Sequence, residues 1–430
     1  MKILDSGALD FGDEFKNLLD RAKLDIKDAT TIVGTIIDEI KQDGDEALYK
    51  HIEKFDRWDA KDALAIDPNE MKKAYENLDS QLKDALNLAY KRIYSYHQKQ
   101  LPKSWIEFEK NGSALGQRVT AVDRAGLYIP GGKAAYPSSL LMNAIPAIVA
   151  GVKEIVVTTP APNGELNTLL LAAMHLCGIK EAYKVGGASA IAALAYGTKS
   201  IKKVDVISGP GNIFVATAKK LVFGDVNIDM IAGPSEIGII ADESADVEYL
   251  SIDMLSQAEH DEMASSILIT DSANVAKSVA KRIELDLKTL PREEIARESI
   301  QKRGAIILTK DIDEAINLMN EIAPEHLELM VKNPFDLLPK IKHAGAIFMG
   351  QNTPEAIGDY IAGPNHTLPT GGSAKFFSPL NVENFLKKSS IISMSEEGIN
   401  EIGEAAALLA KIEGLDAHRK SVQIRLKEKR

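Results

Sequence analysis

Short apolar runs alternate with amphipathic stretches from residue 124 to about residue 350. The runs are rich in valine and isoleucine, and the stretches between them carry apolar residues three and four positions apart. The pattern predicts strands at 124–129, 155–159, 182–185, 204–208, 237–241, 267–270, 305–308, 327–331 and 346–349. It predicts helices at 138–150, 166–177, 188–196, 212–223, about 244–260, 274–286 and 312–322. Such alternation indicates βαβ units and parallel, doubly wound sheets.

The two ends of the chain have a different pattern. Residues from about 12 to 100 are highly charged, with apolar spacings that predict helices at 28–41, 43–55 and 69–98. A glycine-rich polar stretch, 363–373, precedes a tail at 382–430 that is predicted to be mostly helical. The fold class expected is α/β, with two doubly wound Rossmann-like domains, a helical N-terminal region and a helical C-terminal tail.

Composition narrows the class of protein. At 430 residues the chain exceeds the size of one ordinary core, and its 45% hydrophobic and 26% charged content is typical of a globular protein. A net charge of −11 argues against nucleic acid as the main partner, since phosphate contacts need an excess of Lys and Arg. The single cysteine, Cys177, allows no intrachain disulfide. No signal-peptide core and no run of ~18 apolar residues occurs, so we expect a cytoplasmic protein that does not enter a membrane.

Four of the eight histidines lie in short polar motifs in the second half of the chain. They are His260, His326, His366 and His418. Each has a carboxylate or a carboxamide close by in the sequence, and imidazole with carboxylate is the usual material of divalent metal sites and of acid–base chemistry near neutral pH. Because the motifs are far apart in the sequence, the fold must bring them together for any joint role.

Each motif alone also has a plain structural interpretation. Gln257 and His260 are three apart on a predicted helix and share a face, yet a polar helix end explains them equally well. Glu325 and His326 adjoin a predicted strand, so their side chains should diverge and suit two separate tasks, or simply mark a strand-entry turn. Asp359 fits an ordinary surface loop.

Glycine turns follow three of the predicted strands in the first series. They are Pro130-Gly131-Gly132, Gly186-Gly187-Ala188 and Gly209-Pro210-Gly211-Asn212. The last opens a helix, the setting of a phosphate at a helix N-terminus, although Phe214 stands where a dinucleotide fingerprint has its third glycine. Three such turns predict a ligand-binding crevice at the carboxyl ends of these strands.

Taken together, the motifs resemble the histidinol dehydrogenase family in order and spacing, from about residue 25 to 425. They are Gly126–Gly132, Gly209–Asn212, Ala232–Glu236, Leu255–Asp261, Ala323–Leu327, Asn365–Thr370 and Glu413–Leu415 with His418. The Ser-Gln-Ala-Glu-His-Asp block at 256–261 is the most specific of them. The resemblance implies an aldehyde-dehydrogenase-like fold and a cytoplasmic homodimer with one Zn2+ per subunit. It implies that L-histidinol is oxidised to L-histidine through L-histidinaldehyde, with two NAD, at the end of histidine biosynthesis.

The resemblance also assigns roles to individual residues. It implies that zinc is bound by Gln257, His260, Asp359 and His418. The substrate would be contacted by these four residues and also by Ser235, His366 and Glu413. It implies that His326 is the repeated proton acceptor and that Glu325 activates water. Tyr128 and Asn212 resemble NAD contacts, and Ser189 stands where the family commonly has a glutamine that contacts NAD. The shorter side chain of Ser189 is expected to leave a water in place or to loosen NAD.

The same resemblance suggests a division of the chain. An N-terminal arm (1–23) would precede an α/β domain with the metal and catalytic residues (24–123 and 236–376), into which an NAD-binding domain (124–235) is inserted. The tail (377–430), with Glu413 and His418, would complete the active site of the partner subunit. Two other functions remain open: a zinc dehydrogenase of another small amino alcohol or polyol, and a zinc hydrolase. The substrate contacts argue against the first, and the three glycine turns against the second.

Overall fold

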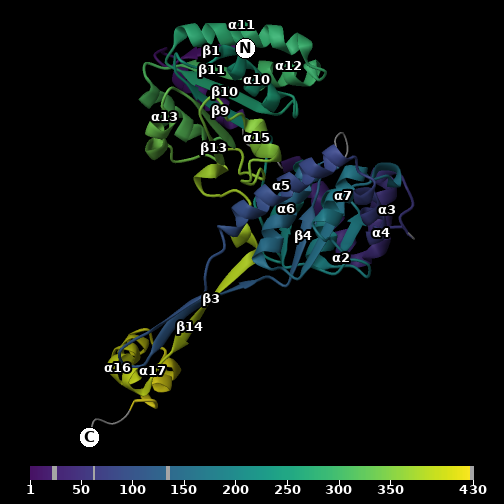
Figure 1. The fold of residues 1–430 in the computed structure, drawn as a ribbon. Coiled ribbons are helices and arrows are strands. Elements are labelled where there is room, and N and C mark those ends of the chain that lie inside the picture. Colours follow the sequence, from purple (N-terminus) through teal and green to yellow (C-terminus); the bar gives the residue numbers. More distant parts are fainter. Residues whose placement is uncertain (22–26, 62, 132–135, 427–430) are drawn as a thin grey trace. The chain divides into compact units, whose positions relative to one another are not determined.

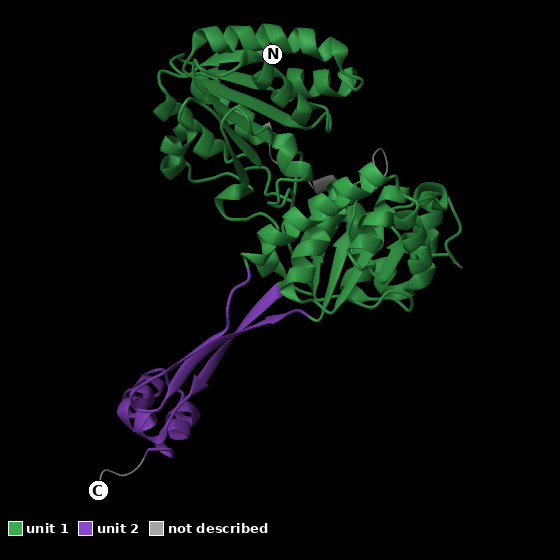
Figure 2. Ribbon diagram, viewed as in Figure 1, with its two compact units in different colours: residues 1–100, 123–385 green, residues 101–122, 386–430 purple. Residues whose placement is uncertain are grey.

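The computed structural model describes residues 1–21, 27–61, 63–131 and 136–426. The chain divides into two compact units (Figure 2). Unit 1 comprises Met1–Gln100 and Asp123–Phe385, and unit 2 comprises Leu101–Val122 and Leu386–Arg430. Unit 1 contains two separate parallel sheets, of six and five strands, and unit 2 contains one antiparallel sheet of three strands.

The six-stranded sheet of unit 1 is parallel throughout. Its strands, in spatial order, are β1 (Lys2–Asp5), β11 (Ala305–Leu308), β10 (Ser265–Thr270), β9 (Glu236–Ala241), β12 (His326–Met330) and β13 (Ala346–Met349). Helices cover both faces, as Figure 1 shows. They are α10 (Val247–Ala258), α11 (Ala273–Asp286) and α12 (Glu293–Arg303) on one face, and α1 (Phe11–Arg21) and α13 (Ile312–Ile322) on the other.

The six-stranded sheet and its helices form one lobe of unit 1, with a core on each face of the sheet. Successive side chains of β9 point alternately into these two cores. Ile237 and Ile239 pack into the core beneath α10 and α11, whereas Ile240 packs into the core beneath α1 and α13. Because both faces are buried, the strand is apolar at every position apart from Glu236, which is the expected pattern for a parallel sheet. Helix α15 (Glu355–Tyr360), the short α14 (Pro334–Leu337) and the 3₁₀ turns η2 (Leu287–Thr289), η3 (Leu338–Lys340) and η4 (Ser373–Lys375) complete the lobe.

The five-stranded sheet of unit 1 is also parallel. Its strands, in spatial order, are β6 (Glu181–Lys184), β5 (Glu154–Thr159), β4 (Arg124–Tyr128), β7 (Val206–Ser208) and β8 (Asn227–Ile228). The connecting helices are α6 (Pro137–Ala150), α7 (Thr168–Leu176), α8 (Gly187–Tyr196) and α9 (Ile213–Val222), with the 3₁₀ turn η1 at Pro162–Gly164. The strand order reverses between β4 and β7, the position at which open α/β sheets bind ligands beyond the carboxyl ends of their strands.

The charged N-terminal region is helical, as predicted, but beyond α1 it packs on the five-stranded sheet. Its helices are α2 (Lys27–Asp43), α3 (Asp45–Asp56), α4 (Pro68–Glu76) and α5 (Ser80–Gln98). Val33 and Ile37 of α2 and Leu48 of α3 share one core with α8 and α9. The expected grouping of residues 24–123 with the metal-carrying domain therefore does not match this packing. Apolar spacing predicts a buried face but does not say which sheet the face will cover.

Unit 2 is small and partly apolar on its surface. It contains β2 (Trp105–Phe108), β3 (Ala114–Ala121) and β14 (Leu386–Ser393), with α16 (Glu396–Ile412) and α17 (Asp416–Gln423). Strand β3 pairs antiparallel with both neighbours, so the two chain segments that enter the unit are joined through one sheet. The hydroxyl of Ser395 caps α16 by accepting from the N–H of Gly398.

Three predicted elements differ from those observed. Residues 2–5 of the expected arm form β1, an edge strand parallel to β11. The predicted helix 69–98 is two helices, because Asp79 caps the second one by accepting from the N–H of Gln81. The tail is not all helical, since residues 386–393 form β14. The residues of β14 are exposed or half-buried, so the sequence lacks the apolar alternation by which a covered strand is predicted. Short η5 (Val382–Phe385) precedes β14.

None of the helices in the described parts of the chain combines the length and the apolar character needed to cross a lipid bilayer.

Candidate active site

The backbone of one residue, Glu236, fixes the orientation of the two predicted catalytic residues. The N–H of Glu236, the first residue of β9, donates to Oε2 of Glu325 at 2.9 Å. The carbonyl oxygen of Glu236 lies 3.0 Å from Nδ1 of His326. Both side chains are buried and lie at the amino end of β12, with His326 opposite Ile237 of β9 in the register. Although they are sequence neighbours, the residues have separate hydrogen bonds, as expected for two separate tasks.

The hydrogen bond of His326 determines which ring nitrogen can take a proton. A carbonyl oxygen can only accept, so Nδ1 must carry the hydrogen that is donated to Glu236. Nε2 is then left with its lone pair, and it is buried with no hydrogen-bond partner among the described residues. It lies 3.8 Å from Oδ1 of Asp359. This ring is therefore oriented as a proton acceptor.

Burial shifts the pKa of both catalytic groups. It lowers the pKa of His326 to about 4, below the ~6.5 of a free imidazole, so the ring is neutral at neutral pH. Burial raises the pKa of Glu325 well above its usual value, and the negative charges of Glu236, Asp359 and Glu355 raise it further. A raised pKa makes the Glu325 carboxylate a stronger base toward water.

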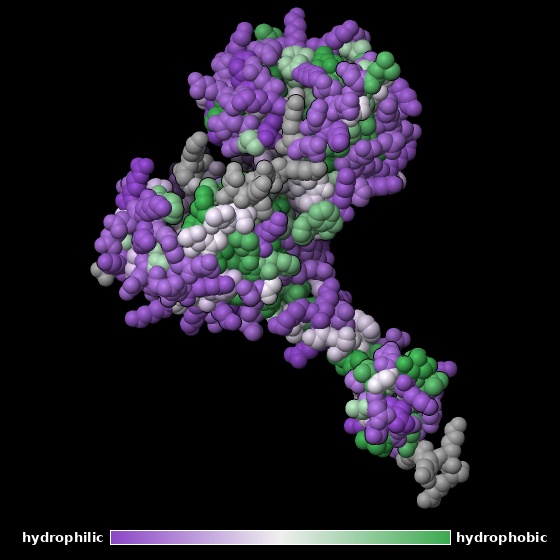
Figure 3. Space-filling view, turned by 180° about the vertical axis from the view of Figure 1, so that it is seen from behind, coloured by the Kyte–Doolittle hydropathy of each residue, from purple (hydrophilic) through white to green (hydrophobic). Residues whose placement is uncertain are grey.

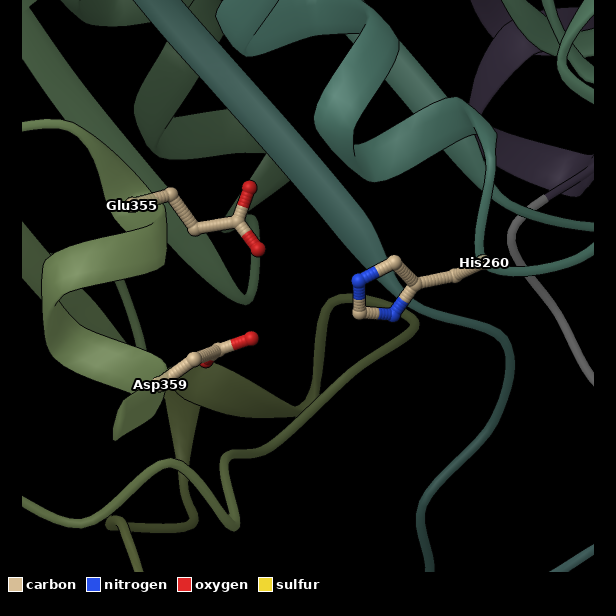
Figure 4. A group of neighbouring side chains, drawn as sticks. All are labelled: His260, Glu355 and Asp359. Atoms are coloured by element: carbon tan, nitrogen blue, oxygen red, sulfur yellow. The ribbon is translucent and has the colours of Figure 1, made fainter. Parts of the chain in front are cut away.

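A group of metal-ligating side chains lies beside His326. His260, Glu355 and Asp359 each offer a ligand atom, and these atoms lie within 4.8 Å of one another. Figure 4 shows the imidazole of His260 directed at the two carboxylates, which project from successive turns of α15. His260 lies just beyond the end of α10, rather than on the helix as predicted.

The buried amide of Gln257 indicates that this group fits a cation. Gln257 is fully buried in α10, and neither its oxygen nor its nitrogen has a hydrogen-bond partner among the described residues. A buried amide without partners is costly, and a metal ion would satisfy its oxygen. The N–H of His260 donates to the carbonyl oxygen of Gln257, which keeps the two residues within one turn. Nitrogen and oxygen ligands without thiolates suit Zn2+ with an exchangeable position.

Two predicted substrate contacts adjoin the same group. Nδ1 of His366 lies 2.8 Å from the backbone oxygen of Asp359, which leaves Nε2 of the ring as an acceptor. Nε2 lies 3.4 Å from the hydroxyl of Ser139. Ser235 is half-buried and immediately precedes Glu236, whose backbone N–H and carbonyl oxygen orient the predicted catalytic pair. The structure thus brings His366 beside Asp359 and keeps Ser235 next to the start of β9.

The last two residues of the predicted zinc and substrate site, Glu413 and His418, lie on unit 2. Glu413 and His418 are exposed, and neither belongs to the group formed by His260, Glu355 and Asp359, which lies in unit 1. The two residues belong to different helices of the tail. Glu413 ends α16, Gly414 turns the chain with a φ of 76°, and His418 lies in α17. Glycine readily adopts this left-handed conformation, which ends the first helix.

The predicted NAD contacts lie at the carboxyl edge of the five-stranded sheet. The N–H of Gly187 donates to the phenol oxygen of Tyr128 at 3.3 Å, across the gap between the ends of β4 and β6. Burial raises the pKa of Tyr128 to about 12, so the phenol keeps its proton. Asn212 is exposed and caps α9 by accepting from the N–H groups of Phe214 and Val215. Gly132, of the first glycine turn, lies outside the described residues.

Ser189 has a different environment from the one predicted. Its side chain is buried in the first turn of α8, and its hydroxyl lies 2.9 Å from Nδ1 of His51. Nε2 of His51 in turn lies 2.6 Å from Oε2 of Glu39. The Ser189 hydroxyl is therefore engaged with the α2–α3 layer. Ser189 is better interpreted as a residue that holds α8 in place than as a shortened NAD contact.

Glu355 is the functional candidate that sequence reasoning missed. Its carboxylate is 2% exposed, and its N–H donates to Oε1 of Glu328. Burial raises the pKa of Glu355 well above its usual value, and the charges of Asp359 and Glu328 raise it further. The available signal was the spacing: Glu355 lies four residues before Asp359, which puts both on one face of any helix there.

The chain has an α/β fold like that of aldehyde dehydrogenases, and it carries a candidate acid–base pair beside a candidate metal centre. The crystal structure of an acetylating aldehyde dehydrogenase from Geobacillus thermoglucosidasius shares the fold, with a TM-score of 0.50 at 15% identity, over 89% of this chain and 97% of that one. A family model described as histidinol dehydrogenase matches residues 19–426. The chain belongs to the histidinol dehydrogenase family.

Individual relatives agree with this assignment. Histidinol dehydrogenase of Sulfurimonas denitrificans is 68% identical over 418 residues, which are 97% of each chain. The crystal structure of histidinol dehydrogenase from Elizabethkingia anophelis matches with a TM-score of 0.93 at 36% identity, covering 99% of this chain and 98% of that one. The family and the aldehyde-dehydrogenase-like fold predicted from the sequence are both confirmed.

Proposed function

We propose that this chain oxidises L-histidinol to L-histidine through L-histidinaldehyde, in two successive hydride transfers to NAD. The observation that carries the proposal is Nε2 of His326, which is buried and has no hydrogen-bond partner among the described residues. It lies beside Asp359, one of the candidate metal ligands, and the chain belongs to the histidinol dehydrogenase family. An alcohol must lose a hydride and a proton to become an aldehyde. A buried neutral imidazole with one free lone pair is suited to receive that proton.

His326 takes the hydroxyl proton in the first oxidation. Its Nδ1 stays bonded to the carbonyl oxygen of Glu236, so the ring does not need to turn when Nε2 becomes protonated. Asp359, 3.8 Å from Nε2, favours the imidazolium that forms. His326 acts again in the second oxidation, when the hydrated aldehyde loses its second hydride and a hydroxyl proton.

Glu325 prepares the water for the intervening hydration. One carboxylate oxygen is held by the N–H of Glu236, which leaves the other to accept a proton from water. Its raised pKa increases its strength as a base. The water oxygen then adds to the aldehyde carbon, giving the gem-diol from which the second hydride leaves.

Gln257, His260 and Asp359 would hold one zinc ion per subunit, and His418 of the partner subunit would complete the set. When bound, the ion supplies an anchor for the imidazole and amine nitrogens of histidinol. The ligand atom of Glu355 lies within 4.8 Å of those of His260 and Asp359, and a Glu355 carboxylate would add to the attraction for a cation. His366, Ser235 and Glu413 recognise the cationic substrate through hydrogen bonds and charge.

NAD occupies the carboxyl edge of the five-stranded sheet, where Tyr128 and Asn212 contact it. The reversal of strand order between β4 and β7 supports this location, as does the glycine turn that opens α9. In this scheme residues 124–235 form the NAD-binding region and the lobe of β9 and β12 carries the metal and the catalytic pair. The sequence has a single cysteine and so no intrachain disulfide, which is compatible with a cytoplasmic enzyme in a reducing compartment.

The reaction is tested by following absorbance at 340 nm with L-histidinol and NAD. We expect NADH to form only when both substrates are present, and also when L-histidinaldehyde replaces L-histidinol. A protein that binds zinc but forms no NADH from either compound would contradict the proposal and would point to the hydrolase alternative.

The site is completed by a second copy of the chain. Unit 2 exposes large apolar side chains on both its sheet and its helices, some of them visible as green atoms in Figure 3. They include Phe108, Ile392, Leu409, Ile412 and Ile424, each more than half exposed. Exposed apolar surface of this extent marks a protein interface. A homodimer would cover it and bring Glu413 and His418 of the partner subunit to the active site.

Mixing two inactive variants tests this shared site. His326→Asn chains mixed with His418→Asn chains are expected to regain activity, because each heterodimer has one site with both defects and one with neither. With random exchange, about a quarter of all sites become intact. The matched control is His326→Asn mixed with Glu325→Gln, where every site retains a defect, so steady turnover of histidinol to histidine should stay absent. If the first mixture stays inactive although mass measurements show exchange, each tail completes its own chain's site.

A further inference from the structure

A buried ion pair holds the turn that follows β7. Lys219, two turns into α9, is paired with Asp229, just after β8, and the two side chains are 3% and 0% exposed. Nζ of Lys219 donates to the carbonyl oxygen of Gly209 at 2.9 Å. The N–H of Gly209 donates to Oδ2 of Asp229, also at 2.9 Å. One charged pair therefore fixes both polar backbone groups of Gly209.

The position of Gly209 leaves no space for a side chain. Its φ is 122°, and a Cβ at this residue would lie 1.9 Å from the carbonyl oxygen of Tyr128. The ends of β4 and β7 are thus in direct contact through Gly209, at the point where the strand order of the sheet reverses. A small rotation of this peptide would displace both the start of α9 and the end of β4.

The chemistry of the next peptide explains why a cation is needed there. The peptide between Gly209 and Pro210 has no N–H, because proline lacks one, so the carbonyl is its only polar group. A carbonyl oxygen that faced a phosphate would repel it. Lys219 binds this oxygen from within the protein, on the side of α9 away from solvent.

We infer that Lys219 and Asp229 are positioning residues for NAD: they hold the Gly209–Asn212 turn so that the start of α9, and not the Gly209 carbonyl, faces the cofactor's phosphates. This inference rests on the proposed NAD site. The helix N-terminus favours anions through its dipole, and Asn212 caps that same terminus. The pair itself has no net charge, so its effect on NAD is exerted through the geometry of the turn.

A double variant separates this role from simple stability. Removing one partner leaves a buried unpaired charge and destabilises the fold, whereas Lys219→Met with Asp229→Asn leaves no charge behind. The amide that replaces the Asp229 carboxylate still offers one acceptor oxygen, but the Gly209 carbonyl loses its ammonium donor. We expect the Kd of NAD, measured by calorimetry without histidinol, to rise at least about tenfold, as for one lost buried hydrogen bond. The KM for NAD should rise similarly, and kcat at saturating NAD should change much less.

Arg124→Met is the matched control. Arg124 is buried at the amino end of β4, at the opposite edge of the same sheet, and its guanidinium pairs with Glu154 and Glu181. Its loss should lower the melting temperature and leave the Kd of NAD unchanged. Zinc content should equal that of the natural protein in both variants, since neither alters the lobe that carries His260.

The outcomes are distinct. A Kd of NAD within about twofold of the natural protein's, alongside a lowered melting temperature, would show that the pair is only structural and would overturn the inference. If the double variant does not fold, Lys219→Arg alone decides: it leaves no buried charge unpaired, but the larger planar guanidinium displaces the donor that the Gly209 carbonyl receives, and an unchanged Kd would overturn the inference equally. Absence of saturable NAD binding by the natural protein would instead refute the proposed NAD site.

Discussion

Replacing His260 by asparagine is expected to remove bound zinc and to reduce NADH formation to background. His260 supplies the only imidazole in the group it forms with Glu355 and Asp359 among the described residues, and nitrogen donors are central to zinc affinity. The residue is exposed and lies just past α10, so the substitution should cost little stability, within about 0.5 kcal/mol. Metal content by atomic absorption, together with the melting temperature, measures both effects.

A control and a rescue make the result specific. His343→Asn changes a histidine in the segment before β13, outside the metal group, and should keep zinc and activity. A chelator should inactivate the natural protein, and added zinc should restore it, because a site that binds substrate must be accessible. Full activity of a zinc-free preparation would refute the metal assignment.

Glu325→Gln and His326→Asn are expected to separate the two half-reactions. If His326 is the base in both oxidations, its replacement should slow the oxidation of histidinol and of histidinaldehyde alike, by roughly 10²–10⁴-fold. The amide oxygen that Glu325→Gln introduces can still accept from the N–H of Glu236, so the site should keep its shape in that variant. Only the proton transfer from water is lost, and the second oxidation should suffer far more than the first.

Single-turnover measurements distinguish the two variants. Glu325→Gln should give a burst of one NADH per site from histidinol and then stall, whereas His326→Asn should give no burst. Equal losses in both half-reactions for Glu325→Gln would remove its assignment as the base for water. A general base is also excluded if the rate of the affected step falls by less than about tenfold. The affected step is either oxidation for His326→Asn and the second oxidation for Glu325→Gln.

Much of unit 1 could be predicted because both of its parallel sheets are buried on both faces. Strands β5 and β9 contain the apolar runs Ile155–Val157 and Ile237–Ala241, and the observed bounds differ from the predicted ones by about one residue. The same rule fails for unit 2. Strand β14, with the sequence Leu-Lys-Lys-Ser-Ser-Ile-Ile-Ser, is largely exposed, so neither an apolar run nor an alternation marks it.

Local pattern also could not assign helices to sheets. The apolar faces of α2 and α3 were predicted, but their packing against α8 and α9 depends on contacts between residues far apart in the chain. Strand β1 was missed because four residues at a sheet edge carry too little signal.

The candidate site was predictable as a set of motifs but not as a geometry. The sequence identified Glu325 and His326, yet only the structure shows that the backbone of one residue, Glu236, orients them both. It could not reveal that Ser189 turns inward to His51, since that contact joins residues 138 positions apart. Glu355 escaped notice because α15 is only six residues long and has no apolar periodicity.

The stoichiometry of NADH formed per L-histidinol consumed tests the central claim most directly. The natural protein should form two NADH for each histidinol and release histidine, because a four-electron oxidation needs two hydride acceptors. The ratio should fall toward one in Glu325→Gln, with histidinaldehyde as the product. A ratio of one in the natural protein, with the aldehyde released, would contradict the account and make the chain a simple alcohol dehydrogenase.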